Sequence, residues 1–191
     1  LIIGPPNTPY FNGFYIFKFK FPNNYPHQPP KVIYHTNDGI TRFNPNLYRS
    51  GKVCLSILNT WKGPQWTGFQ TISSILLSLC SAVLTDTPLL NEPGITKLHC
   101  DYYKYNEIIR FKNFEVAMIK MLECELIVKK FPEIHEVMIN HFINNYDEIK
   151  NQVKSLKTPN KIITTSLYNM KIVIDYQKVE TQLEHLYKKL K

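Results

Sequence analysis

Apolar and polar positions alternate in the first third of the chain, whereas they follow a helical period after it. Segment 14–21 places aromatic side chains at every second position from Tyr15, with Lys18 and Lys20 on the opposite face. The aromatic face consists of Tyr15, Phe17, Phe19 and Phe21. A period of two is typical of a half-buried antiparallel β-strand, and Pro22-Asn23-Asn24 ends it. Segment 31–35, which is entered through Pro29-Pro30, predicts a second strand.

From Thr71 onward, apolar residues recur every three or four positions, which predicts helices. Thr71 or Gln70 is suited to open the first of them, in segment 72–84. Later helices are predicted over 108–125, 133–156 and 175–190. Pro132 and Pro159 fall between these segments, where helix breakers belong. The pattern therefore predicts an α+β protein whose strands come first and whose tail is helical.

The charge of the chain is spread along it. The formal net charge is +8; residues 1–100 hold eight Lys or Arg against three Asp or Glu, and residues 101–191 hold fifteen against twelve. Without a dense basic block or a nucleic-acid-binding motif, we expect no nucleic-acid partner but a mildly basic surface that attracts acidic proteins. The most apolar segment, 72–84, is interrupted by polar residues and shorter than the roughly 20 residues that cross a bilayer, so no membrane insertion is predicted.

Four widely spaced cysteines leave open which chemistry they serve. They are Cys54, Cys80, Cys100 and Cys124. No C-x-x-C pair occurs and the His99–Cys100 pair lacks zinc spacing, so we predict no metal site. The start, LIIGPPNTPY, lacks the basic region of a secretory signal, and we expect reduced thiols in a cytoplasmic or nuclear compartment. A lone cysteine is either an inert small apolar residue or a nucleophile.

A series of short motifs occurs in a recognisable order. It runs IIGPPNTPYFNGFYIFKFKFPNNYPHQPPKV, NPN, GKVCLSIL, a Trp and ISSILLSL. This order and spacing resembles the core of the ubiquitin-conjugating enzymes over residues 1–95. Within that family, the chain is most similar to the C-terminally extended Z class. The matching stretches are RFNPNLYRSGKVCLSILNTWKGPQW, NEPG, YNEIIRF and DYQKVETQL.

The resemblance implies the ubiquitin-conjugating (UBC) fold, an antiparallel β-meander with an active-site loop and helices packed across the sheet. It implies a catalytic core over 1–95 and a helical C-terminal extension over 96–191. The family's N-terminal helix, where the activating enzyme docks, and its first strand do not precede Leu1. Since Leu1 is not an initiator Met, either these elements lie upstream in a longer chain or this chain is compromised in loading.

The extension carries apolar residues that either dock on the core or wait for a partner. They include Ile108, Phe111, Met118, Leu122, Met138, Phe142, Leu183 and Leu186. The Z-class resemblance favours docking, with an influence on which activating enzyme or modifier is accepted.

The resemblance assigns Cys54 as the residue that carries the modifier as a thioester. A thiol suits a relay because it attacks an incoming thioester almost isoenergetically and leaves readily when an amine attacks. Asn46 stands eight residues earlier, at the family's catalytic spacing. Its carboxamide N–H is implied to stabilise the oxyanion. An Asn in a proline-flanked turn is also a structural residue, and both roles stay open.

Neighbouring residues receive structural or weaker assignments. Structural roles are expected for Asn44, Pro45, Trp61 and Trp66. Asn44 stands where most of the family has His, although the Z class also has Asn there. Asp86, Asn91 and Glu92 surround the position of the family's acidic residue without any of them aligning cleanly with it. Of the three, we take Glu92 as the candidate that helps to deprotonate the attacking lysine.

Two surface loops bear on the ligase partners. The family meets its ligases through loops that correspond here to 26–28 and 67–69. His27, beside Gln28, stands where a large apolar residue is common, and Gly68-Phe69 replaces the usual Pro-Ala. Losing an apolar anchor from a small interface costs up to a few kcal/mol, so we expect the usual ligase contacts to be weakened.

The sequence thus predicts a transferase that accepts ubiquitin or a ubiquitin-like protein from an activating enzyme and passes it to a substrate lysine, with or without a ligase. The activating enzyme consumes the ATP, so no cofactor is expected in this chain. The alternative is a non-catalytic ubiquitin-binding module of the same fold. Such modules lack the cysteine, whereas this chain keeps Cys54 and Asn46.

Overall fold

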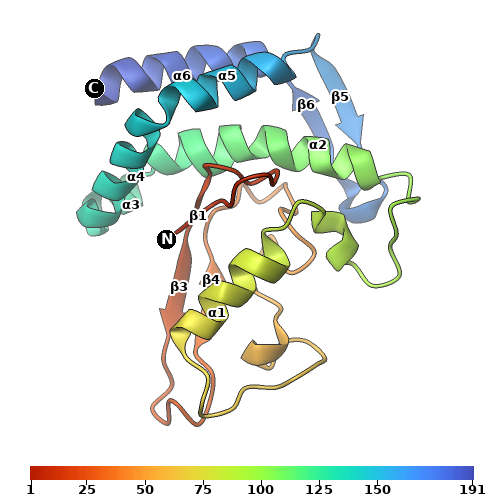
Figure 1. Cartoon of the computed structure of the whole chain (residues 1–191), viewed down its shortest axis with the longest axis vertical. Helices are drawn as coiled ribbons and strands as arrows, with labels where there is room; N and C mark the ends of the chain where they lie inside the picture. The colour runs from red at the N-terminus through yellow and green to blue at the C-terminus, as the bar shows by residue number, and fades with distance from the viewer.

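The computed structural model describes all residues 1–191 and has an α+β fold, which confirms the predicted fold class. Helix α2 runs through the middle of the molecule, with α1 and the β3–β4 strands on one side of it and α5 and α6 on the other (Figure 1). The strands are β1 Ile2–Ile3, β2 Phe14–Tyr15, β3 Phe17–Lys20, β4 Lys31–Tyr34, β5 Lys161–Thr164 and β6 Lys171–Ile174. The α-helices are α1 Ile72–Ser78, α2 Tyr102–Lys112, α3 Glu125–Lys130, α4 Pro132–Asn144, α5 Tyr146–Leu156 and α6 Tyr176–Leu190.

The N-terminal strands form an antiparallel meander of short pieces. β1 pairs with β2, and β3 pairs with β4 in a register that sets Phe17 opposite Tyr34. A single bridge from Ile33 to Lys52 then connects β4 to the segment that approaches Cys54. The sheet therefore leads directly to the predicted nucleophile.

The prediction of one continuous strand over 14–21 is wrong. It divides at Ile16, whose N–H donates to Thr36 Oγ1 at 2.8 Å, while that hydroxyl donates to Phe14 O at 2.9 Å. A side chain thus takes the place of a strand partner at the break. Phe21, expected on the buried face, lies beyond the end of β3 and is 49% exposed.

Helix α1 begins where the sequence predicts. Thr71 is its N-cap and forms a reciprocal capping box with Ser74, which satisfies backbone N–H groups that have no partner within the helix. The helix continues as a π-helical segment, Leu79–Val83, and Ile75 and Leu79 are fully buried. The predicted helix over 72–84 is confirmed.

The tail is not only helical: a β-hairpin that the helical description of the extension did not include occupies 161–174, between the helices predicted over 133–156 and 175–190. There, β5 and β6 form an antiparallel hairpin in which Ile163 pairs with Ile172. Both strands are rich in β-branched residues, KIIT and KIVI, which favour a pleated surface. Figure 1 shows this hairpin at one end of α2, beside the loops of the N-terminal half.

One continuous hydrophobic cluster of 43 buried residues extends from Ile2 to Leu186. It contains every apolar residue of the extension expected to dock, from Ile108 and Phe111 to Leu183 and Leu186. Helix α2 and its π-helical continuation, Asn113–Lys120, supply much of it. The extension is therefore packed on the core, and the boundary at residue 95 stays a prediction of sequence alone.

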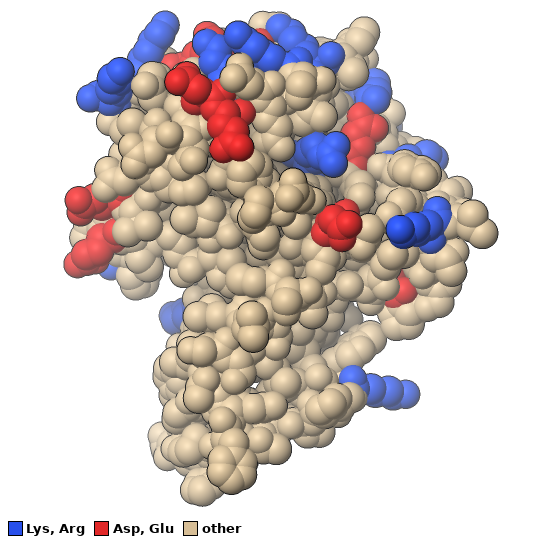
Figure 2. Space-filling model, viewed as in Figure 1, with Lys and Arg blue, Asp and Glu red and all other residues tan.

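The charged side chains lie mainly on the C-terminal half. Lys and Arg are interleaved with Asp and Glu over α5 and α6, and the lobe formed by α1, β3 and β4 shows few charges on this face (Figure 2). Two ion pairs on these helices are Lys150–Glu184 and Lys157–Glu180, each at 2.9 Å. None of the helices has the length and apolarity that a bilayer crossing needs.

Candidate active site

The segment around Cys54 is held by reciprocal contacts with Asn46. The Cys54 N–H donates to Asn46 O at 2.9 Å, and Asn46 Nδ2 donates to Cys54 O at 2.7 Å. On the other side, Thr60 Oγ1 donates to Val53 O and accepts from Leu55 N–H, both at 2.9 Å. The backbone on both sides of Cys54 is therefore fixed by hydrogen bonds.

A glycine turn returns the chain from the sheet to Cys54. Gly51 has φ +85°, a conformation that side chains other than glycine rarely adopt. Its carbonyl accepts from Tyr34 N–H at 2.8 Å, and a Cβ at this position would lie 2.9 Å from Tyr34 O. This turn thus allows the Cys54 segment to pass close beside β4.

Cys54 itself is only 1% exposed, and its neighbours Val53 and Leu55 are also buried. The other thiols are more accessible: Cys100 is exposed, and Cys80 and Cys124 are intermediate. Burial raises the pKa of the Cys80 thiol, which disfavours its reactive thiolate. Cys54 is therefore the least exposed of the four thiols.

Asn44 is fully buried, and its side chain joins three segments. Its Nδ2 donates to Val83 O at 2.8 Å and to Tyr10 OH at 3.2 Å. Its Oδ1 accepts from Asn46 N–H at 2.8 Å and from Asn91 Nδ2 at 3.3 Å. All of these bonds are internal, which supports the structural role predicted for Asn44, and Pro45 beside it is buried as well.

The Arg42 side chain bonds to the backbone of the same loop. Its guanidinium donates to Asn44 O at 3.1 Å and to Pro45 O at 2.7 Å, and it lies 3.5 Å from the centre of the Tyr48 ring. Sequence reasoning missed this residue. A basic side chain two residues before the NPN motif was the only available signal.

Glu92 lies in the segment that follows α1, next to Asn91, whose Nδ2 donates to Ala82 O at 2.8 Å. The Glu92 carboxylate accepts a short hydrogen bond from Tyr168 OH of the extension. Pro93 lines an open groove together with Asn59, Thr60 and Trp61. The groove therefore places Pro93, the residue after Glu92, beside the loop that follows Cys54.

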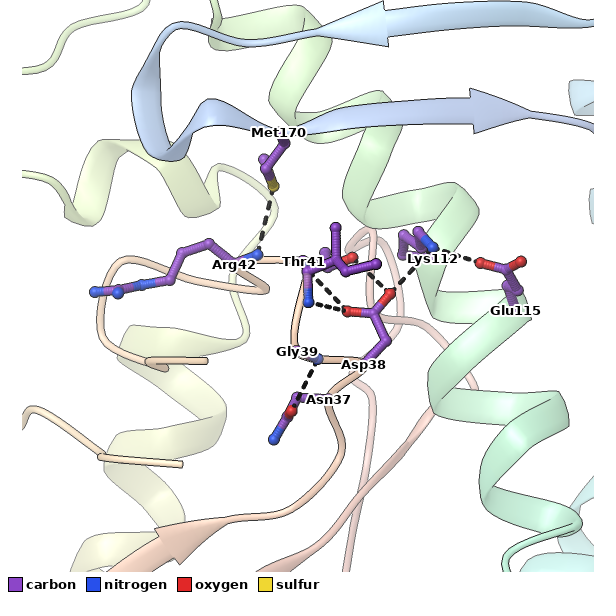
Figure 3. Close-up of polar contacts among 9 residues, drawn as sticks. Asn37, Asp38, Gly39, Thr41, Arg42, Lys112, Glu115 and Met170 are labelled. Carbon is purple, nitrogen blue, oxygen red and sulfur yellow. Dashed lines mark hydrogen bonds and ion pairs between the residues drawn. The ribbon is translucent and has the colours of Figure 1, made fainter. Parts of the chain in front are cut away.

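The segment before the NPN motif is held by a partly buried ion network (Figure 3). Lys112 Nζ lies 3.0 Å from Asp38 Oδ2 and 2.6 Å from Glu115 Oε2. Asp38 also accepts from Thr41 N–H at 2.7 Å. Burial raises the pKa of Asp38, but the bonds from Thr41 and Lys112 outweigh it and hold this pKa below its ordinary value.

The two loops predicted to face a ligase lie side by side. Trp66 Nε1 donates to Pro26 O at 2.7 Å and links them, and Trp66 is 8% exposed. The residues assigned to these loops, His27, Gln28, Gly68 and Phe69, are all exposed. Phe69 is 98% exposed. Trp61, expected to pack, is instead 44% exposed, so that prediction is wrong.

His99, Cys100 and Asp101 place one potential ligand atom each within 4.8 Å of one another. His99 Nδ1 already accepts from Asp101 N–H at 3.1 Å, and Asp101 Oδ2 accepts from Ser166 Oγ at 2.6 Å and Leu167 N–H at 2.9 Å. These bonds tie the start of α2 to the tip of the β5–β6 hairpin. The predicted lack of a metal site stays a prediction.

Known proteins give this geometry its context. A family model described as ubiquitin-conjugating enzyme matches residues 1–113. Ubiquitin-conjugating enzyme E2 Z of Danio rerio is 46% identical over 151 residues, which are 77% of this chain and 45% of that protein. The Homo sapiens protein of the same name is 45% identical over 151 residues, 77% of this chain and 42% of that protein.

A third relative has a different size and name. The dual E2 ubiquitin-conjugating enzyme/E3 ubiquitin-protein ligase BIRC6 of Homo sapiens is 39% identical over 161 residues, 80% of this chain and 3% of that protein. This chain thus spans less than half the length of the curated relatives described here.

Proposed function

This chain belongs to the ubiquitin-conjugating enzyme family, and from that premise we propose that it carries ubiquitin or a ubiquitin-like protein as a thioester on Cys54 and transfers it to a lysine. The single observation that carries the proposal is the pair of reciprocal hydrogen bonds between Asn46 and Cys54. These bonds join the two residues whose eight-residue separation matches the catalytic spacing of the family.

The reaction has two steps. First, the Cys54 thiolate attacks the thioester carbonyl presented by the activating enzyme. A new C–S bond to Cys54 forms, and the thiolate of the activating enzyme leaves. Second, a lysine amine attacks the carbonyl on Cys54, a C–N bond forms, and the Cys54 thiolate leaves while the amine proton passes to a base. Thioester exchange is nearly isoenergetic and amide formation is downhill, so neither step needs a further energy source.

Asn46 and Glu92 are proposed to act in the second step. One N–H of the Asn46 carboxamide is engaged by Cys54 O, and the other is the proposed donor to the oxyanion. Glu92 is the proposed acceptor of the amine proton. Asn44 and Pro45 shape the loop that carries Asn46.

The partners follow from the chemistry. We propose an activating enzyme, the modifier, a substrate lysine and optionally a ligase that meets the loops at 26–28 and 67–69. The activating enzyme uses the ATP, so this chain needs no cofactor. A thioester carrier requires reduced thiols, which is why we place it in the cytoplasm or nucleus.

The alternative is a module of the same fold that binds ubiquitin without chemistry. One observation favours it: Cys54 is 1% exposed, whereas a nucleophile has to meet its substrate. Under this alternative, Cys54 acts as a small apolar core residue.

Intact-mass measurement after incubation with activating enzyme, ATP and ubiquitin separates the two functions. The wild type is expected to gain one modifier that a reducing agent removes. Cys54→Ser is expected to retain it as a more stable oxyester, and Cys54→Ala to gain nothing. Cys100→Ala, which removes the exposed thiol, is the matched control and is expected to load normally. A reducible adduct that persists on Cys54→Ala would overturn the assignment.

The role of Asn46 is tested separately, because exchange and amine attack pass through different transition states. Asn46→Ala is expected to load nearly normally and to discharge to free lysine about 10- to 1,000-fold more slowly, as for the loss of an oxyanion donor. An equal loss in both steps would mean that Asn46 only shapes the loop.

A further inference from the structure

The tip of the β5–β6 hairpin lies against the two segments that carry the proposed catalytic groups. Tyr168, at this tip, donates through its hydroxyl to Glu92 Oε2. The Tyr168 carbonyl accepts from Arg49 at 2.6 Å, and its ring lies 5.1 Å from the Arg42 guanidinium. Tyr168 therefore contacts the Glu92 segment and the Arg42 side chain at the same time.

Its backbone conformation is unusual. Tyr168 has φ 61°, in the left-handed region that a bulky side chain rarely adopts. Such a residue is kept only where its surroundings determine it, and these sites are frequent near functional groups. Here the surroundings are the bonds at both ends of the residue, to Arg49 and to Glu92.

The tip is anchored on both flanks. Asp101 Oδ2 accepts from Ser166 Oγ and from Leu167 N–H, and Met170 Sδ accepts from Arg42 N–H at 3.4 Å (Figure 3). Burial and, as a smaller cause, the bond to Glu92 raise the pKa of the Tyr168 hydroxyl. The hydroxyl therefore keeps its proton at neutral pH and stays a donor to the carboxylate.

Arg42 links the same tip to the NPN motif. Its guanidinium donates to Asn44 O and Pro45 O while it faces the Tyr168 ring. Tyr105, which forms a tilted ring pair with Tyr168 at 6.0 Å, donates its hydroxyl to Arg42 O. Contacts from the extension thus reach both the loop that carries Asn46 and the segment that carries Glu92.

We propose that Tyr168 is a positioning residue for the amine-attack step, one that orients the Glu92 carboxylate toward the attacking lysine. The inference rests on the proposed function. With Oε2 held by Tyr168, Oε1 is left to accept the proton. As the C–N bond forms, the amine nitrogen becomes acidic, its N–H bond breaks, the proton moves to Oε1, and the C–S bond to Cys54 breaks.

Single-turnover discharge of the preloaded 191-residue chain, measured over a series of free-lysine concentrations, tests this proposal. Tyr168→Phe keeps the ring and removes only the hydroxyl. We expect its maximal discharge rate to fall about tenfold, the order of one hydrogen bond to a charged group. The half-saturating lysine concentration, the loading on Cys54 and the melting temperature are expected to stay at wild-type values.

A double-mutant cycle separates positioning from a general structural role. Glu92→Gln is expected to slow discharge at least as much as Tyr168→Phe, and the double variant no more than Glu92→Gln alone, since both act on one group. Tyr103→Phe is the matched control, because Tyr103 lies on α2 with 79% exposure, and its loss of a hydroxyl is expected to change nothing.

Two sets of outcomes overturn the inference. Discharge of Tyr168→Phe at or above the wild-type rate, wild-type discharge by Glu92→Gln, or effects of the two substitutions that multiply would overturn it and leave the proposed function intact. A wild-type chain that gains no adduct on Cys54 overturns the proposed function and this inference with it.

Discussion

The molecule has two β-hairpins with four-residue strands, β3–β4 and β5–β6. Their strands pair alike, but the segments that connect the strands have different surroundings. Both are antiparallel with four paired positions. The first is connected by segment 21–30, whose residues His27 and Gln28 are exposed. The second is connected by segment 165–170, which bonds to Asp101, Arg49 and Glu92.

The difference teaches that strand pairing alone does not decide what a hairpin contributes. The β3–β4 connection faces outward and meets other proteins under the proposed function. The β5–β6 connection lies against the rest of the molecule, where it bonds to Asp101 at the start of α2, to Arg49 and to Glu92. Substitutions in the 165–170 connection should therefore change both stability and the site, and substitutions of exposed residues in the 21–30 connection should change only contacts with other proteins.

The largest effect is expected from deleting residues 158–191. The deletion removes eight buried apolar residues: Ile163, Met170, Ile172, Ile174, Tyr176, Val179, Leu183 and Leu186. At about 1.5–3 kcal/mol for each buried apolar side chain, the loss exceeds about 10 kcal/mol, comparable with the roughly 5–15 kcal/mol that stabilises a whole domain. We expect no cooperative melting transition near the wild-type temperature.

Thermal unfolding of the two chains measures this effect, and loading assays with two activating enzymes test whether any folded remainder has changed selectivity. An unchanged melting temperature would mean that the extension is an independent appendage, and the inference from the Z class would lose its support.

A smaller effect is expected at single positions within β6. Ile172 is 4% exposed and Val173, its neighbour on the opposite face, is 58% exposed. Ile172→Ala should lower the free energy of unfolding by about 2–4 kcal/mol, since it leaves a cavity. Val173→Ala, the matched control, should change it by about 0.5 kcal/mol or less. Urea unfolding measures both, and equal effects would show that the hairpin does not pack as described.

Asp38, just beyond β4, gives a pH-dependent effect of intermediate size. Because its folded-state pKa lies below the ordinary value of about 3.9, its stabilisation is present at neutral pH and is lost as pH falls through the folded pKa. Asp38→Asn should therefore cost about 1–3 kcal/mol at pH 7 and progressively less below about pH 4.

Urea unfolding at several pH values checks this expectation, with Asp86→Asn as the control that removes an exposed carboxylate. A wild-type-to-variant difference that stays constant down to pH 2 would show that the network with Lys112 is not the cause.

The smallest effect on stability is expected beside the outward-facing connection. Phe69 is 98% exposed, so Phe69→Ala should change the free energy of unfolding by less than about 0.5 kcal/mol. Discharge to free lysine should be unchanged, whereas ligase-stimulated discharge should slow. The ratio of the two rates is the measurement, and an unchanged ratio with an active ligase would remove Phe69 from the proposed interface.

Much of the N-terminal half could be predicted because its signals are local. Thr71 caps α1 with a residue three positions away, and Asn46 meets Cys54 across a turn set by Gly51. Period and turn chemistry act over such short separations.

The rest depends on contacts between residues far apart in the sequence. Nothing near Tyr168 indicates that it meets Glu92, and the break at Ile16 depends on a hydroxyl from Thr36. The β5–β6 hairpin had a local signal, in its β-branched residues, but it lay within a tail whose surroundings follow a helical period. The 1% exposure of Cys54 arises from tertiary packing that no motif encodes.

The continuous hydrophobic cluster has a consequence for how the protein is made. Its members extend from Ile2 to Leu186, so the ribosome synthesises the N-terminal strands well before the residues that cover them. At roughly 5–20 residues per second, the 78 residues after position 113 take on the order of 4–16 s. During that interval the nascent chain exposes apolar surface that α5, α6 and the second hairpin later bury. Chaperone contact with the emerging chain should therefore be concentrated in these seconds and decline once α6 has packed on the cluster.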